Sequence, residues 1–196
     1  MSSTGRHIIA TRLMEMTGLD MIQFGFVDFS ECFEGPICLD SGDRLWDFGD
    51  TAGYLWFIES GFGFDRMLLE DGKRMLNGMI EPGIFVCDEQ QLIFGVPSVS
   101  QAIVNTPTIA YRISCDRWFE FLNENQGMAG VIHNINAHFI QMRKARLLKM
   151  KHMEKRAYWD YIKDRFPGVE QFCTQTEIAH YFGVSKSTMH RIMKEA

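Results

Sequence analysis

The C-terminal segment 174–192 holds the polar side chains whose types and spacing are best suited to chemistry. Lys186, Ser187, His190 and Arg191 fall together on the outer face of an expected helix. Lysine and arginine neutralise DNA phosphates, and arginine pairs with guanine edges in the major groove. The segment therefore predicts a surface that contacts double-stranded DNA.

Two short helices must position that surface. Thr174 and Glu177 have the spacing of a capping box, so a helix begins there. Gly183 tolerates the left-handed backbone of a tight turn, and Ser185 is a good cap for the next helix. These signals predict a helix-turn-helix; the alternative is a helical hairpin with no role in DNA binding. The expected core between the two helices is Ile178, Ala179, Phe182, Val184, Met189, Ile192 and Met193.

The charge of the chain is divided between its two ends. From Arg143 onward the sequence has twelve Lys/Arg and six Asp/Glu, which gives +6. The first 142 residues have eight basic and nineteen acidic groups, or −11, so the overall charge of −5 hides a basic end. This pattern is typical of a chain in which only one end meets a polyanion. The alternative is a solvated charged helix over 143–156.

A long helix is predicted ahead of the helix-turn-helix, because apolar residues recur there at steps of three and four. This spacing favours packing on a partner helix in a homodimer; the alternative is a helix that lies on its own β-domain. A second helix over 153–166 is expected to end at Phe166-Pro167-Gly168. The candidate dimer-interface residues are Met128, Ile132, Ile135, Phe139 and Met142.

Residues 35–117 have the pattern of a β-domain. Short β-branched and aromatic runs alternate with Gly, Pro and Asp-Gly, and Asp71-Gly72 between two alternating runs predicts a hairpin. Many short antiparallel strands over this length indicate a sandwich or jelly roll. Residues 1–20 are expected to form a short amphipathic helix or a loose arm.

A β-roll, a long helix and a helix-turn-helix in this order resemble the Crp/Fnr superfamily of bacterial transcription regulators. The resemblance extends from about Gly42 to Ala196. It is carried by Gly49, 54–58 and Gly61, by the hairpin 69–73, by Pro82-Gly83-Ile84-Phe85, and by the recognition-helix segment 185–191. It implies that Lys186, Ser187 and Arg191 contact bases and that Thr174, Gln175 and Thr176 contact phosphates. Thr188 and His190 complete the expected DNA-binding set.

The resemblance also implies an α+β architecture in three parts. Residues 1–126 would form an effector-sensing, double-stranded β-helix (a jelly roll like that of cyclic-nucleotide-binding domains). Residues 127–152 would form the dimerisation helix, and 153–196 a winged-helix-like DNA-binding domain whose wing is absent or minimal. An effector would reorient the DNA-binding heads on a palindromic operator, about a hinge near Lys151 to Met153. RNA polymerase is a further partner that the resemblance implies.

The effector is not expected to be cyclic AMP. Relatives that bind it have a Gly-Glu-Leu-type stretch and an Arg-Ser pair, which become Cys87-Asp88-Glu89 and Ser100-Gln101 here. Without the arginine, the cyclic phosphate loses its bidentate partner. A neutral or aromatic effector suits the segment better; the alternative is that the segment only fills the core of the roll. The candidate pocket residues are Phe94, Val99, Ser100, Gln101 and Asn105.

Other classes of protein fit the sequence less well. Five cysteines without a CxxC motif suggest reduced thiols in a cytoplasm, and no segment has the composition of a membrane span. A cupin-like metal enzyme needs histidines on its strands, yet none occurs between His7 and His133. No nucleophile motif is present, so we expect no enzyme, metal or cofactor. The remaining alternative is an effector-independent dimeric interaction module whose helix-turn-helix binds protein, which salt-dependent DNA binding would exclude.

Overall fold

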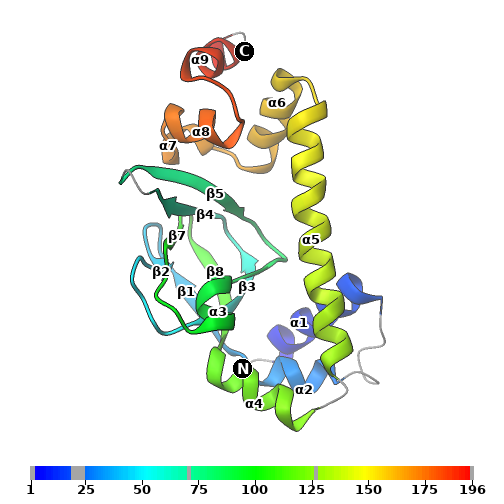
Figure 1. Ribbon diagram of the computed structural model, residues 1–196. Helices are drawn as coiled ribbons and strands as arrows, with labels where there is room; N and C mark the ends of the chain where they lie inside the picture. Colours follow the sequence, from blue (N-terminus) through cyan, green and yellow to red (C-terminus); the bar gives the residue numbers. More distant parts are fainter. Residues whose placement is uncertain (1–2, 19–24, 70–71, 126–127, 195–196) are drawn as a thin grey trace.

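The computed structural model describes residues 3–18, 25–69, 72–125 and 128–194; the side chains of 3, 4, 6, 128–135, 138 and 139 lie outside that description. Helices surround and extend a β-roll, and the C-terminal helices lie at one end of it (Figure 1). In chain order the elements are α1 (Ser3–Thr17), α2 (Phe26–Glu31), β1 (Glu34–Leu39), β2 (Arg44–Trp46), β3 (Tyr54–Ser60), β4 (Gly63–Leu68), β5 (Arg74–Ile80), β6 (Phe85–Val86), α3 (Glu89–Phe94), β7 (Ser100–Val104), β8 (Thr108–Ser114), α4 (Cys115–Glu124), α5 (Met128–His152), α6 (Lys155–Arg165), α7 (Val169–Phe172), α8 (Gln175–Tyr181) and α9 (Lys186–Lys194).

The strands form two antiparallel sheets that face each other. Their orders are β1-β8-β3-β6 and β2-β7-β4-β5. The α+β class and the jelly roll predicted from the sequence are thus confirmed. The predicted strands on either side of Asn105-Thr106-Pro107 correspond to β7 and β8.

Strand β3 shows why the roll needs helices on its outside. Leu55 and Phe57 join a cluster with residues of α1, α2 and α4, whereas Trp56 and Ile58 pack between the two sheets. Because successive side chains of a strand point to opposite faces, an apolar residue at every position means that both faces are covered. The sequence pattern did not predict α2 or α3, each of which has six residues.

The predicted hairpin is the pair β4 and β5. Its register runs from Gly63 opposite Ile80 to Leu68 opposite Arg74. Gly72 has φ +76°, the left-handed conformation for which an Asp-Gly turn selects glycine, while Asp71 lies outside the described residues. This hairpin forms the edge of the roll that faces the C-terminal helices (Figure 1).

Helix α5 runs beside the roll from α1 to the C-terminal helices (Figure 1). Its 25 residues reach from Met128 to His152. Arg143 forms an ion pair with Glu89 at the start of α3, and Arg146 donates to the Asn77 carbonyl of β5 at 2.7 Å. One face of α5 therefore contacts the chain's own roll.

The helices α6 to α9, here called the head, have a core of their own. The second helix predicted after α5 spans Lys155–Arg165 and begins where Glu154 accepts from the Ala157 amide at 2.9 Å. Trp159 and Phe182 are fully buried, and Phe64 and Leu76 of the roll belong to the same apolar cluster. The head is thus docked on the β4–β5 side of the roll.

Candidate nucleic-acid interface

Helix α8 begins with the capping box that the sequence predicts. The Thr174 hydroxyl accepts from the Glu177 amide at 3.2 Å, and the Glu177 carboxylate accepts from the Thr174 amide at 2.8 Å. The turn after α8 contains Gly183 with φ +63°, and Ser185 caps α9 by accepting from the Thr188 amide at 3.1 Å. The local signals therefore place the two helices as expected. Ile178, Ala179, Phe182, Met189 and Ile192 are buried between them and α6, with Val184 and Met193 partly buried beside them.

The outer face of α9 is exposed and cationic. Lys186, Ser187, His190 and Arg191 are exposed, whereas Thr188 is half-buried and bonds its hydroxyl to that of Ser185 at 2.8 Å. None of Lys186, Arg191 and Lys194 has an ion-pair partner in the part of the chain that the structure describes. The charges of this face are available to an anionic partner.

The start of α8 lies beside that face. Thr174 and Thr176 are exposed, and the Gln175 amide is 3.0 Å from His190 Nδ1 on α9. The structure thus brings the predicted phosphate-contacting and base-contacting residues onto one end of the head. Thr176 has no side-chain hydrogen bond among the described residues, whereas Thr174 is committed to its cap.

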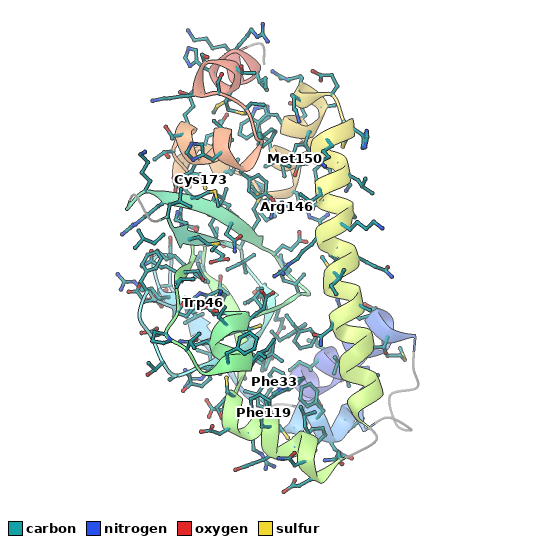
Figure 2. The ribbon with its side chains drawn as sticks, in the orientation of Figure 1. Phe33, Trp46, Phe119, Arg146, Met150 and Cys173 are labelled. Carbon is teal, nitrogen blue, oxygen red and sulfur yellow. The ribbon has the colours of Figure 1, made fainter. Side chains whose placement is uncertain are left out.

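The other side of α8 meets the roll through a buried ion pair. Arg66 of β4 is 7% exposed, and its Nε donates to Glu177 at 2.7 Å. A second nitrogen of Arg66 donates to the Phe172 carbonyl at 2.8 Å and approaches Cys173 Sγ at 3.8 Å. Figure 2 shows Cys173 at this junction between α7 and the hairpin. One carboxylate, that of Glu177, therefore both caps the start of α8 and attaches the helix pair to the roll.

The ionisation of these groups follows from their surroundings. Burial alone would raise the pKa of Glu177, but hydrogen bonds from Thr174 and Arg66 outweigh it and hold the pKa below its ordinary value. Burial raises the pKa of Cys173 to about 12, although Arg66 opposes the shift. Glu177 is therefore a carboxylate and Cys173 a neutral thiol at neutral pH.

Two further contacts hold the head against the roll and α5. Arg165 of α6 binds Glu81 with both ends of its guanidinium, one of them at 2.7 Å. Arg146 of α5 lies over the Tyr181 ring at 3.9 Å from its centre, and Figure 2 shows it directed from α5 toward the head. Burial raises the pKa of the Tyr181 phenol, so this ring stays neutral.

The interior of the roll is occupied by its own side chains at the segment where an effector was expected. Trp46 donates its indole N–H to the Ser100 hydroxyl at 2.8 Å. The Ser98 hydroxyl donates to Asp88, and both residues are buried. Nearby, burial raises the pKa of Asp65, and the charges of Asp88 and Glu89 add to that effect, while Asn77 opposes it. An acidic interior of this kind repels an anionic phosphate.

The five candidate pocket residues do not meet in one cavity. Ser100 points into the roll toward Trp46, whereas Gln101 lies on the opposite face of β7 and donates to Asp47. Phe94 and Val99 are 73% and 44% exposed. Successive side chains of a strand point to opposite faces, so Ser100 and Gln101 cannot line the same pocket although they are adjacent in the sequence.

Gln101 and Asn105 instead line a cleft between the roll and the head, which we call the roll–head cleft. Its volume is about 480 Å³. Arg66, Arg74, Gln101, Ile103 and Asn105 form its roll side, and Phe172, Thr174 and Glu177 form its head side. A separate cavity of about 390 Å³ opens between the sheets near β1 and β2, where Arg44, Tyr54, Trp56 and Arg112 are among the lining residues.

Sequence reasoning missed Arg66 and Arg74 as residues of a possible site. Arg66 follows Phe62 and Phe64 in the alternating run of the hairpin. An arginine on the same strand face as two aromatic residues is a cation that must find a buried carboxylate. The sequence therefore indicated that Arg66 needs a carboxylate partner. It did not indicate that this partner is Glu177, 111 positions further along the chain.

The side chains of the predicted dimer seam lie largely outside the described residues. Met142, the described member, is 37% exposed. Arg146 lies two turns beyond position 139 on the same side of α5, and it contacts the chain's own Tyr181. Three further exposed apolar residues of the described part of α5 are on a different side from the predicted seam: Ile140, Leu147 and Leu148.

Neither a metal site nor a membrane span is evident in the described parts of the chain. No three His, Cys, Asp or Glu side chains there are grouped to hold a metal ion. No described helix combines the length and the apolar character that crossing a membrane requires.

Comparisons with solved structures identify the fold. The chain is similar to the c-di-GMP-responsive global regulator CLP of Xanthomonas campestris, with 16% identity, a TM-score of 0.59 and coverage of 81% of this chain and 84% of that one. It is similar to DNR of Pseudomonas aeruginosa, with 17% identity, a TM-score of 0.58 and coverage of 100% and 88%. It is also similar to the Thermus thermophilus catabolite activator protein, with 18% identity, a TM-score of 0.53 and coverage of 94% and 85%. No family model and no curated protein sequence matches the chain. The chain therefore shares the fold of these regulators, and this is the fold that the sequence resemblance implied.

Proposed function

We propose that this protein is a DNA-binding transcription regulator. The observation that carries the proposal is the exposed cationic face of α9, which has no ion-pair partner among the described residues, on a well-packed helix pair. A helix of this kind fits the major groove, where Arg191, Lys186 and Ser187 would contact base edges. His190 and Thr188 lie beside them, and Thr174, Gln175 and Thr176 would contact the phosphates.

The test is binding to DNA selected from a random duplex pool. We expect log affinity to fall linearly with log salt concentration, because each phosphate contact releases counterions. The double variant Lys186→Ala/Arg191→Ala should lose most binding, whereas the matched variant Lys163→Ala, on α6, should retain it. Salt-independent behaviour, or retained binding by the double variant, would contradict the proposal in favour of a module that binds protein.

The proposed active form is a homodimer joined along α5, bound to a palindromic operator. Ile140, Leu147 and Leu148 support this proposal, since they are 65%, 50% and 49% exposed on a single helix. Sedimentation of Ile140→Asp/Leu147→Asp should give monomers, because like charges would be buried against their own copies. The variant Ile135→Asp/Phe139→Asp tests the seam predicted from sequence in the same way, and a dimer that survives both pairs would contradict an α5 interface.

The proposed regulation is an effector that changes the position of the head relative to the roll. The hinge would lie near Lys151 to Met153, at the end of α5, and RNA polymerase would be the downstream partner. A ligand can shift such an equilibrium only as far as it binds one arrangement better than the other. Millimolar cyclic AMP and cyclic GMP should leave the melting temperature unchanged, because Trp46, Ser98 and Asp88 occupy the interior; a concentration-dependent rise would overturn that expectation.

A further inference from the structure

The roll–head cleft contains acceptors that the protein itself does not satisfy. Gln101 is 4% exposed and directs its amide nitrogen to the Asp47 carboxylate, which accepts only. Its oxygen Oε1 is buried and has no donor among the described residues. Asn105 Oδ1, in the same cleft, is also buried without a donor. Folded proteins rarely leave such acceptors unpaired, and both residues line the cleft, so a molecule with donor groups bound there could complete their hydrogen bonding.

The cleft is also positively charged on its roll side. Arg66 and Arg74 both line it, and Glu177 is the one carboxylate among its described lining residues. Arg66 is fully engaged by the head, whereas Arg74 is exposed, lies 5.9 Å from the centre of the Phe48 ring and has no ion-pair partner in the described parts of the chain. The guanidinium of Arg74 is therefore the group in this cleft that can bind an anion.

The two observations together define the class of ligand. Two arginines disfavour a cationic amine, so neutral donors suit Gln101 and Asn105, and hydroxyl groups are the simplest of these. We propose that the roll–head cleft binds a small polyhydroxylated anion, with its anionic group on Arg74 and its hydroxyls on Gln101 and Asn105. Sugar phosphates and sugar acids share this chemistry, and the experiment separates them.

Binding of the ligand would favour release of the head from the roll. Its principal partners are all on the roll, while Glu177 of the head repels an anion and holds Arg66. The ligand therefore binds better when Glu177 withdraws, and by linkage it favours release of the head. This consequence rests on the proposed function; the binding itself does not.

Isothermal titration calorimetry on the full chain tests the site with glucose 6-phosphate, gluconate, glucose and inorganic phosphate. We expect saturable binding of glucose 6-phosphate or gluconate, and whichever binds identifies the source of the anionic group. Glucose should fail because it lacks charge, and inorganic phosphate should fail because it offers no extended set of hydroxyls. Equal binding of inorganic phosphate, or no binding of either hydroxylated anion at millimolar concentration, overturns the proposal.

Variants locate the binding. Arg74→Ala and Asn105→Ala should each weaken it by about tenfold or more, the size of one well-made hydrogen bond to a charged or buried group. Glu177→Gln should strengthen it, a gain that a purely structural role of Glu177 would not produce. Arg112→Ala, in the other cavity and paired with Glu34, is the matched control and should bind as the wild type does. Binding that is insensitive to Arg74→Ala places the ligand elsewhere and overturns the proposal.

The outcomes are separable from those of the proposed function. Loss of ligand binding with intact DNA binding contradicts this inference alone. Ligand binding in a chain that does not bind DNA contradicts the proposed regulator alone.

Discussion

The two sides of the head use the same kinds of charged residue for opposite purposes. On α9, Lys186 and Arg191 are exposed and unpaired among the described residues, so solvent stabilises their charges until a partner replaces it. At the junction with β4, Arg66 and Glu177 are withdrawn from solvent, with side chains 9% and 12% exposed. A buried charge must keep its partner, whereas an exposed one can exchange it. The exposed face of α9 is therefore suited to binding a partner, whereas the Arg66–Glu177 pair fixes the position of the head on the roll.

The largest expected effect comes from removing the cation at the junction. Arg66→Ala leaves Glu177 buried and unpaired, which typically costs about 3–5 kcal/mol of stability. Urea denaturation followed by circular dichroism measures the loss. Arg143→Ala removes an exposed ion pair with Glu89, whose two side chains are 64% and 51% exposed, and should cost at most about 1 kcal/mol. Similar costs for the two variants would show that the junction is no more than a surface contact.

Acid should weaken the same contact without any substitution. The pKa of Glu177 lies below its ordinary value of 4.5 in the folded chain, so its stabilising contribution is complete above pH 4.5 and is lost as the pH falls through the lowered pKa. Denaturation midpoints measured from pH 7 down to pH 3 should fall more for the wild type than for Glu177→Gln. Parallel curves for the two proteins would exclude Glu177 as the titrating group.

On the exposed side the expected effect is on specificity, and it is smaller. Arg191→Ala should remove about 1–3 kcal/mol of discrimination at one base pair of each half-site, the value of a good bidentate contact. The melting temperature should not change, because Arg191 is exposed and unpaired in the described structure. Footprinting on selected DNA gives the readout. An unchanged consensus sequence would remove Arg191 from the base-contacting set.

The smallest expected effect lies where the two sides meet, at the start of α8. Thr174→Ala removes the cap and should cost about 1 kcal/mol. Thr176→Ala, two residues further on, should change stability by less than about 0.5 kcal/mol, since its hydroxyl has no partner among the described residues. Thermal denaturation of the pair measures the difference. Equal stability of the two variants would mean that Glu177 alone holds this helix end.

The helix-turn-helix could be predicted almost completely from the sequence because its signals are local. Thr174 and Glu177 are three positions apart, Gly183 and Ser185 form one turn, and all of them act on their own backbone. The hairpin β4–β5 was predictable for the same reason, through Gly72. Each of these caps and turns depends on residues that are close together in the chain. Their spacing can therefore be read directly from the sequence.

The effector region was not predictable in the same way. Ser100 and Gln101 are adjacent in the chain, yet pleating of β7 directs Ser100 toward Trp46 and places Gln101 on the opposite face, where it donates to Asp47 and lines the roll–head cleft. The helix α3 at 89–94 has six residues, too few to display a helical period, and its turn leaves Phe94 exposed. Which residues line a cavity depends on the direction of each side chain, and a segment of sequence does not specify that direction.

By itself the sequence determined the order of the elements, the basic end, the capping of α8 and the outward cationic face of α9. Only the tertiary structure decided that both carboxylate oxygens of Glu177 are hydrogen-bonded. One oxygen caps α8, and the other pairs with Arg66 of β4. The tertiary structure also decided that Gln101 and Asn105 meet Arg74 at one cleft. The physical reason is distance along the chain: Arg66 and Glu177 are 111 residues apart, and their pairing depends on how two separately formed surfaces pack, with burial making any wrong pairing costly.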